Sequence, residues 1–217
     1  MLFGRSSMLT SLVLVVALTA TAKAQDLFPD KLESQYSTGW TVTYSDSFKV
    51  IEGPAIGKIV AYQSGTPPPT IEGATTVVQI PLATVTLLST SYIPFFEILG
   101  RRSSIIGIAN TEAVSSACLQ AAITAGTCGN IGSENWAPSI TDINTVGADA
   151  TFSGTYNMAG LGPIDGVAIP MAEEAEMSGI ASAEWLEYAP LPSPPAQLSV
   201  HFLRGCCGPQ VRGALFQ

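Results

Sequence analysis

Polar and aromatic side chains recur in this sequence directly after its short apolar segments. Aromatic rings can pack against a ligand, while hydroxyl, amide and carboxylate groups can hydrogen-bond to it. Each residue taken alone is more simply an ordinary turn or capping residue. As a set, they indicate a binding surface. We expect the following residues to face a ligand: Ser91, Tyr92, Tyr156, Asn157, Trp185 and Glu187.

The groups that most enzymes use are largely missing. His201 is the single histidine and no G-x-S-x-G motif occurs, so a Ser-His-Asp hydrolase would lack its base. The acids Glu173, Glu174 and Glu176 fall in a predicted helix, where we expect them to form a solvated face. The sequence therefore predicts a protein that is not an enzyme.

Cofactor motifs are incomplete. Residues 53–59 (GPAIGKI) are one residue short of a phosphate-binding loop and end in isoleucine where a hydroxyl is required. Residues 160–166 (GLGPIDG) place Pro163 where a phosphate-binding N–H is needed. With one histidine and no C-x-x-C pair, a zinc site built from His and Cys is excluded. We expect no cofactor and no metal site.

Cys118 and Cys128 leave one question open. They could form a disulfide in an oxidising compartment. On one continuous helix they would lie about 15 Å apart, beyond the roughly 4.4–6.8 Å that a disulfide allows between Cα atoms. A break in the helix near Gly126 would have to bring them together.

The elements that position the expected binding residues alternate between strands and helices. Residues 84–88 (TVTLL) are apolar on both faces, as a parallel sheet covered by helices on two sides requires. The hydroxyl residues 89–91 then cap a helix at 92–99, which Gly100 ends before a strand at 105–108. Such a βαβ unit belongs to an open sheet that binds ligands outside the carboxyl ends of its strands.

The remaining segments extend this pattern to an α/β fold class. We expect a Rossmann-like lobe with a mostly parallel sheet, preceded by an N-terminal β-hairpin and followed by an irregular C-terminal tail. The expected hairpin has strands 41–44 and 48–51, the other strands are 58–62, 77–80, 150–153 and 180–185, and the other helices are 111–125, 139–146 and 171–177.

The first 24 residues have the pattern of a signal peptide. Arg5 is followed by an apolar stretch at 9–20 and by a small-x-small cleavage pattern at 22–24. We expect cleavage after Ala24 and a secreted or periplasmic protein, with an uncleaved anchor as the alternative. No later stretch is apolar for about 18 residues, the length that a membrane span needs.

The charge is acidic, with nine Lys and Arg against 17 Asp and Glu and a net charge of −8. Removal of Arg5 and Lys23 would lower the nine basic residues to seven, so the net charge would be −10. This balance argues against nucleic acid or an anionic membrane as a partner. It leaves open a cationic ligand or a basic docking surface.

Three segments resemble the first lobe of substrate-binding proteins of ABC transporters that carry ferric siderophores, haem or cobalamin. Residues 77–109 resemble the family's strand with the pattern V-A-L-S-T and the helix that follows it. In the family this helix ends in L-E-A-L-G, and residues 96–100 (FEILG) stand at that position here. Residues 144–152 resemble the family's L-K-P-D-L-V run, with Asp149 matching its aspartate. Residues 183–191 (AEWLEYAPL) are similar to the segment before the helix that joins the two lobes. The resemblance covers about residues 40–191.

The resemblance implies a monomeric solute-binding domain for a metal chelate of the siderophore, haem or cobalamin class, delivering it to a membrane transporter. Its ligand would lie between two lobes. The glutamate with which the family often meets its transporter is replaced by Thr141, beside Asp142, and Glu97 is expected to be a helix-surface acid. We expect the chain to comprise a signal peptide at 1–24, a lead-in and hairpin region at 25–74, the lobe at 75–190 and the tail at 191–217.

The family pattern ends after Leu191, where a long helix and a second lobe would follow. Residues 192–195 (PSPP) cannot form a long helix. The sequence thus leaves a truncated two-lobe protein and a one-lobe protein both open. The alternative function is a secreted structural or surface-interaction domain without a small-molecule ligand, and an enzyme ranks third.

Overall fold

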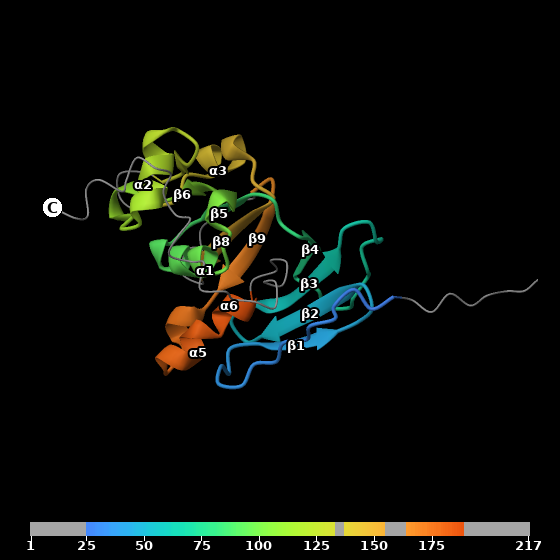
Figure 1. Ribbon diagram of the computed structural model, residues 1–217. Helices are drawn as coiled ribbons and strands as arrows, with labels where there is room; N and C mark the ends of the chain where they lie inside the picture. Colours follow the sequence, from blue (N-terminus) through green and yellow to red (C-terminus); the bar gives the residue numbers. More distant parts are fainter. Residues whose placement is uncertain (1–24, 133–136, 155–163, 189–217) are drawn as a thin grey trace, which may run out of the picture.

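The computed structural model describes residues 25–132, 137–154 and 164–188, and the structural statements below refer to these residues. They form two β-sheets with helices around the second one (Figure 1). The predicted α/β class, with a parallel sheet after an N-terminal hairpin, is confirmed. The predicted signal peptide and the tail at 191–217 lie outside the described residues.

The first sheet contains the predicted hairpin. Its strands β1 (Thr41–Tyr44), β2 (Phe48–Gly53) and β3 (Gly57–Gln63) are antiparallel, and β4 (Thr76–Ile80) joins β3 in parallel. The strand β4, which the expected boundaries assign to the lobe, therefore pairs within the hairpin sheet. Both sheets contribute to one apolar core, because Ile51 and Ile59 belong to the same buried cluster as Phe152 and Ile169.

The second sheet is entirely parallel and has the order β7-β6-β5-β8-β9. From β5 the chain steps outward through β6 and β7, then returns to place β8 on the other side of β5. The point between β5 and β8 is therefore a topological switch point, where open α/β sheets bind their ligands. The strands are β5 (Val85–Leu87), β6 (Ile105–Ile108), β7 (Gly129–Asn130), β8 (Ala150–Gly154) and β9 (Val167–Met171).

Helices follow the first three of these strands. After β5 come η1 (Thr90–Tyr92) and α1 (Ile93–Ile98), with Ser89 capping η1 and Gly100 in the left-handed region at φ 68°. The predicted helix at 111–125 is shorter, because Ser116 caps α2 (Ala117–Thr124) after the short turn η3 (Thr111–Ala113). A second short turn, η2 (Arg102–Ser104), precedes β6. Ser139 caps α3 (Ile140–Val146), which agrees with the predicted helix at 139–146.

The end of the described chain differs from the prediction. The expected helix at 171–177 and strand at 180–185 are wrong, because β9 is followed by η4 (Glu173–Ala175), α5 (Gly179–Ala183) and α6 (Trp185–Tyr188). Pro170 hides β9 from sequence analysis, yet an edge strand tolerates a residue without an N–H. The Ser178 side chain accepts a hydrogen bond from the amide of Ala181 and so starts α5.

Helices cover both faces of β5, as its apolar sequence predicts. Leu87 belongs to the main buried cluster with Phe96 of α1 and Leu119 of α2. Leu88, the next residue, belongs to a second cluster with Ile143 of α3. Because successive strand residues point to opposite faces, β5 is buried on both sides.

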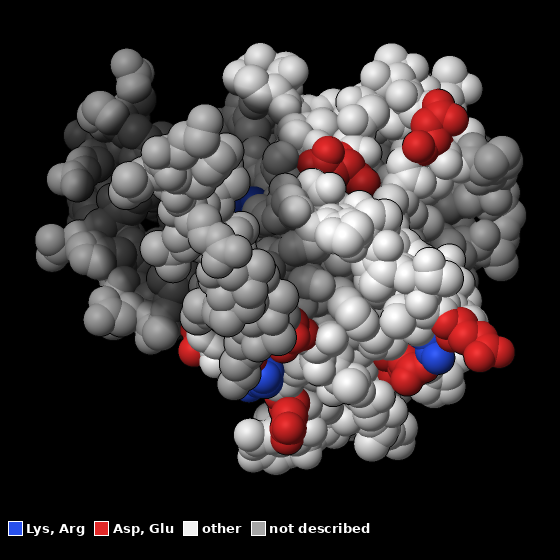
Figure 2. Space-filling model, turned by 90° about the vertical axis from the view of Figure 1, so that its right-hand side faces the viewer, with Lys and Arg blue, Asp and Glu red and all other residues white. Residues whose placement is uncertain are grey.

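The two sheets meet along β9, which lies beside β4 (Figure 1). The Thr76 hydroxyl donates a 3.4 Å hydrogen bond to the Ala168 carbonyl across this boundary. None of the described helices has the length and hydropathy needed to span a bilayer. On the face in Figure 2, acidic side chains lie in separate places, and Lys or Arg side chains lie next to some of them.

Candidate functional site at the carboxyl edge of the parallel sheet

The carboxyl ends of the parallel strands bring polar residues from distant parts of the sequence to one edge. Ser89 and Ser91 follow β5, Gly154 ends β8, and Glu173 follows β9. Because β8 pairs with both β5 and β9, these residues lie around the switch point.

A chain of hydrogen bonds joins the ends of β5 and β9. The exposed hydroxyl of Ser91 donates to Glu173 Oε1 at 2.9 Å, and the Ser89 and Ser91 hydroxyls are 2.9 Å apart. A hydroxyl has a single hydrogen. Since Ser91 gives its hydrogen to Glu173, Ser89 must donate to Ser91. We call Ser89, Ser91 and Glu173 the hydroxyl relay.

The carboxyl group of Glu173 is removed from water. The residue is 7 % exposed, and its Oε2 atom has no hydrogen-bond partner among the described residues. Burial raises the pKa of Glu173 to about 7, although the hydrogen bond from Ser91 acts in the opposite direction. The nearby charge of Glu174 raises the pKa further. Glu173 therefore exchanges its proton close to neutral pH.

Gly154 leaves the room that this arrangement needs. A Cβ atom at this position would lie 2.9 Å from the Tyr92 hydroxyl and 3.6 Å from Glu174 Oε1. Any other residue at the end of β8 would therefore crowd the groups from the neighbouring strand ends. Two more polar atoms near this edge, Ser153 Oγ and Asn110 Nδ2, are buried without a hydrogen-bond partner. Such atoms are few in native proteins and mark a site that calls for an explanation.

Two of the expected ligand-facing residues are core residues instead. Tyr92 is 1 % exposed and Trp185 is 0 % exposed. The Trp185 ring packs against Tyr188 with 4.7 Å between centroids, and its indole N–H donates to Glu176 Oε1 at 2.9 Å. The expectation that these two rings pack against a ligand is corrected accordingly. The expectation for Trp185 depended on a strand at 180–185, whose end would have placed the ring on the rim. The segment is helical instead.

Of the other four residues expected to face a ligand, the structure places only the side chain of Ser91. Ser91 lies exposed at the carboxyl edge, as expected. Tyr156 and Asn157 lie outside the described residues. Glu187 belongs to α6, but its side chain is outside the described part of the structure.

Glu173 is the site residue that sequence analysis misses. The expectation of a solvated acidic helix face is wrong for it, because Glu173 is buried after a strand. The signal was present in residues 167–171, which are largely apolar. Recognising them as an edge strand would have placed Glu173 at a carboxyl end.

Glu176 is also not a solvated acid. It accepts hydrogen bonds from the Ser37 hydroxyl and the Gly39 amide, and Glu184 accepts from the amides of Gln35, Tyr36 and Ser37. We call Glu176 and Glu184, with residues 34–39, the carboxylate clasp. Partial burial alone would raise the pKa of each clasp carboxyl, but the hydrogen bonds outweigh it and lower both pKa values.

Two acids in the family-like segments have structural contacts. Glu97 is half-buried, accepts a hydrogen bond from the Ser116 hydroxyl and lies 4.0 Å from an Arg102 nitrogen. Asp149 Oδ2 accepts hydrogen bonds from the amides of Ala83 and Thr84, at 2.8 and 2.9 Å. Both side chains therefore hold the ends of elements together.

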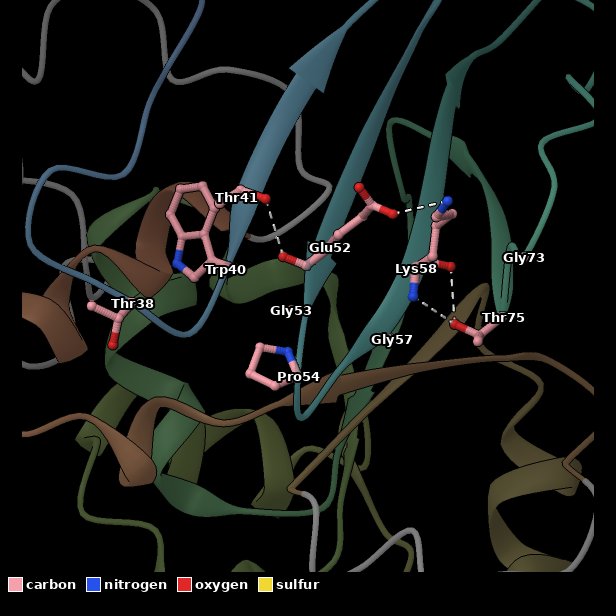
Figure 3. A pocket seen from close by; sticks show the side chains of 10 residues that line it. All are labelled: Thr38, Trp40, Thr41, Glu52, Gly53, Pro54, Gly57, Lys58, Gly73 and Thr75. Carbon is pink, nitrogen blue, oxygen red and sulfur yellow. Dashed lines mark hydrogen bonds and ion pairs between the residues drawn. The ribbon is translucent and has the colours of Figure 1, made fainter.

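A pocket lies at one end of the first sheet, beside the turn between β2 and β3 (Figure 3). Its volume of about 520 Å³ is within the range of small-molecule sites. The ion pair between Lys58 Nζ and Glu52 Oε1, 2.9 Å long, lies at its wall, and the Trp40 indole N–H is buried without a partner. The lining residues come from β1 to β3 and from the segments that precede β1 and β4: Thr38, Trp40, Thr41, Glu52, Gly53, Pro54, Gly57, Lys58, Gly73 and Thr75.

Lys49 is a buried ionisable residue that lies outside the carboxyl edge. It is 7 % exposed on β2, and no hydrogen bond or ion pair to its ammonium group occurs among the described residues. Burial lowers the pKa of Lys49 to about 8. The charged form of this side chain therefore destabilises the fold.

The cysteines and acids of the described residues do not form a metal site. No group of three or more His, Cys, Asp or Glu residues that could hold a metal ion occurs in this part of the chain. Cys118 and Cys128 are not joined by a disulfide. Burial raises the pKa of the Cys128 thiol to about 11, so little reactive thiolate forms at neutral pH.

No family model matches the chain, and no curated protein matches it at a significant level. The resemblance to ABC-transporter binding proteins therefore rests on residues 77–109, 144–152 and 183–191 alone.

Proposed function

We propose that the chain is an exported solute-binding domain for a metal chelate such as a ferric siderophore, acting in ABC-type uptake. The observation that carries the proposal is the hydroxyl relay at the switch point between β5 and β8. Open α/β sheets bind ligands at this place. An edge with exposed hydroxyl oxygens suits the polar periphery of a large chelate.

The sequence supports the same proposal. Residues 77–109, 144–152 and 183–191 follow the order and spacing of the first lobe in the siderophore, haem and cobalamin group. We infer from this resemblance that the partner is a membrane transporter, that the domain acts as a monomer, and that it carries out no chemistry. The proposed location, secreted or periplasmic, depends on cleavage after Ala24.

The test is a calorimetric titration of the mature chain with a ferric trihydroxamate. In this proposal the domain is one lobe that contacts one side of a ligand, so we expect a dissociation constant on the order of 10–100 μM. The Ser91→Ala variant should bind several-fold more weakly. No heat at millimolar chelate would contradict the proposal, and submicromolar binding would contradict its one-sided contact.

A structural or surface-interaction domain is the second candidate, and the burial of Tyr92 and Trp185 favours it. Neither of these two rings is exposed, so the described part of the edge lacks the aromatic surfaces expected of a site for a large ligand. In that case the chelate should produce no heat and should leave the amide resonances of Ser89 and Ser91 unchanged.

A further inference from the structure

We propose that the hydroxyl relay is a subsite for a positively charged, hydrogen-bond-donating group of the ligand, such as a primary ammonium. The inference rests on the proposed function, because it names the part of a chelate that the carboxyl edge would take.

The direction of the hydrogen bonds makes the relay an acceptor. The Ser91 hydrogen points to Glu173 and the Ser89 hydrogen points to Ser91. The Ser89 oxygen also accepts from the Ser91 amide at 3.3 Å. One lone pair on each hydroxyl oxygen is therefore left for a ligand. Ser91 is exposed and Ser89 is half-buried. A ligand group at this edge should therefore bind most strongly when it donates hydrogen bonds to these oxygens.

The negative charge of the subsite lies behind Ser91. The side chain of Glu173 is more than nine-tenths buried and its Oε2 atom is unpartnered. No ion pair joins it to a lysine or arginine among the residues that the structure describes. A ligand cation next to Ser91 would supply the missing opposite charge through one hydroxyl.

The groups around Glu173 do not offer an alternative countercharge. From η1 it faces the phenol of Tyr92, and on its own turn it faces the carboxylate of Glu174. From α5 the neutral Ser182 hydroxyl donates to the Glu173 carbonyl at 3.1 Å. The net charge of −8 also favours cations over anions near the protein.

A proton should leave when the cation binds. Burial sets the pKa of Glu173 to about 7, so near neutral pH a large share of the molecules carry a proton on this carboxyl. A nearby positive charge favours the ionised form and lowers this pKa. Binding of the ammonium group should therefore strengthen between pH 5.5 and 7.5 and release protons to the buffer.

The experiment compares two probes that differ in one group. The first is a linear ferric trihydroxamate that ends in a primary ammonium, and the second is the same chelate with that amine acetylated. At pH 7.5 the ammonium probe should bind about tenfold more tightly to the wild-type chain, as for a charge-assisted hydrogen bond. Glu173→Gln should remove the preference, and Glu72→Gln, which removes an equal charge at an exposed position, should retain it.

The outcomes separate the subsite from the function. Equal binding of the two probes, or an unchanged preference in Glu173→Gln, would overturn the subsite and leave solute binding standing. If neither chelate binds, the proposed function fails, and pentylammonium chloride then tests the subsite alone. The Ser91 amide resonance should shift on titration of the wild type and not of Glu173→Gln. No shift in the folded wild-type chain would overturn the subsite.

Discussion

Ser91 donates a hydrogen bond of 2.9 Å to Glu173, which lies 82 positions later in the sequence. This bond crosses the end of β8 and joins the loops that follow β5 and β9. It couples a water-exposed hydroxyl to a carboxyl group that is closed to water. The buried carboxyl group of Glu173 is thus linked to the solvent-exposed edge of the sheet by the Ser91 hydroxyl.

The titration of Glu173 should make stability depend on pH. Its pKa is about 7 in the folded chain, raised by burial from the ordinary value of 4.5. Its contribution is therefore greatest below pH 4.5 and is lost as pH rises through 7, a change of at most about 3 kcal/mol. Urea unfolding at pH 5 and pH 7.5 should show this loss in the wild type and not in Glu173→Gln.

The control for this prediction is Glu72→Gln, which removes an exposed carboxylate from the loop between β3 and β4. Its unfolding free energy should change with pH as in the wild type. A Glu173→Gln variant with the full wild-type pH dependence would show that Glu173 does not titrate near neutrality.

Truncation of Trp185 should destabilise the fold rather than only weaken binding. The ring is 0 % exposed and contacts Tyr188, and removal of such a side chain costs about 3–5 kcal/mol. Thermal unfolding of Trp185→Ala should show a strongly lowered midpoint without any ligand. A midpoint within 2 °C of the wild type would place Trp185 outside the core.

The parallel sheet could largely be predicted from sequence because its strands are short, apolar and bounded by capping residues. Local sequence patterns leave few alternatives to a strand at residues 84–88 and 105–108. The hydroxyl of Ser139 likewise indicates the start of a helix. The segment after residue 166 could not be assigned in the same way. Pro170 in β9 has no N–H, and only its place at the sheet edge, which depends on the whole topology, makes it acceptable.

Asp149 should be a structural residue despite its place in a family-like motif. Its Oδ2 atom accepts hydrogen bonds from two backbone amides at the start of β5. Asp149→Ala would leave these amides without this acceptor and should cost about 1–3 kcal/mol. Asp149→Asn, which retains an oxygen acceptor, should cost less in the same chemical denaturation. Equal losses in the two variants would contradict the acceptor role.

The carboxylate clasp should open in acid. Its hydrogen bonds lower the pKa values of Glu176 and Glu184 below 4.5, so their stabilising effect is present above pH 4.5 and is lost as pH falls through the lowered values. Hydrogen exchange at the amides of Gln35, Tyr36 and Ser37 should accelerate in Glu184→Ala at pH 6. Glu184→Gln should protect them better than alanine does. Unchanged exchange in Glu184→Ala would rule out the clasp in solution.

Replacement of Lys49 should stabilise the chain. Burial lowers its pKa from 10.5 to about 8 in the folded state. Wild-type stability should therefore rise with pH between about 8 and 10.5, by up to about 3 kcal/mol. Lys49→Met should raise the unfolding midpoint at pH 7 and lose this advantage at pH 10.5. A lower midpoint at pH 7 would show that the ammonium has a stabilising partner.

The candidate site could be predicted only in part. Ser91 follows an evident strand, so its place at a carboxyl edge is a local inference. Glu173, Glu174 and Glu176 have the same side chain, and sequence analysis treats them alike. Their environments differ because Glu173 accepts a hydrogen bond from Ser91 of η1, whereas Glu176 accepts hydrogen bonds from Ser37 and Gly39. These contacts are long-range, and no local periodicity encodes them.

The carboxylate clasp also determines how the molecule should respond to a pulling force. It joins residues 34–39 to residues 176–184, near the two ends of the described chain. A force applied between residues 34 and 184, the two sides of the clasp, would load these hydrogen bonds directly. A force applied at Tyr188 would also load β9, because the Tyr188 hydroxyl donates a hydrogen bond to the Pro170 carbonyl. The clasp should thus bear the load first only when the molecule is pulled at residues 34 and 184.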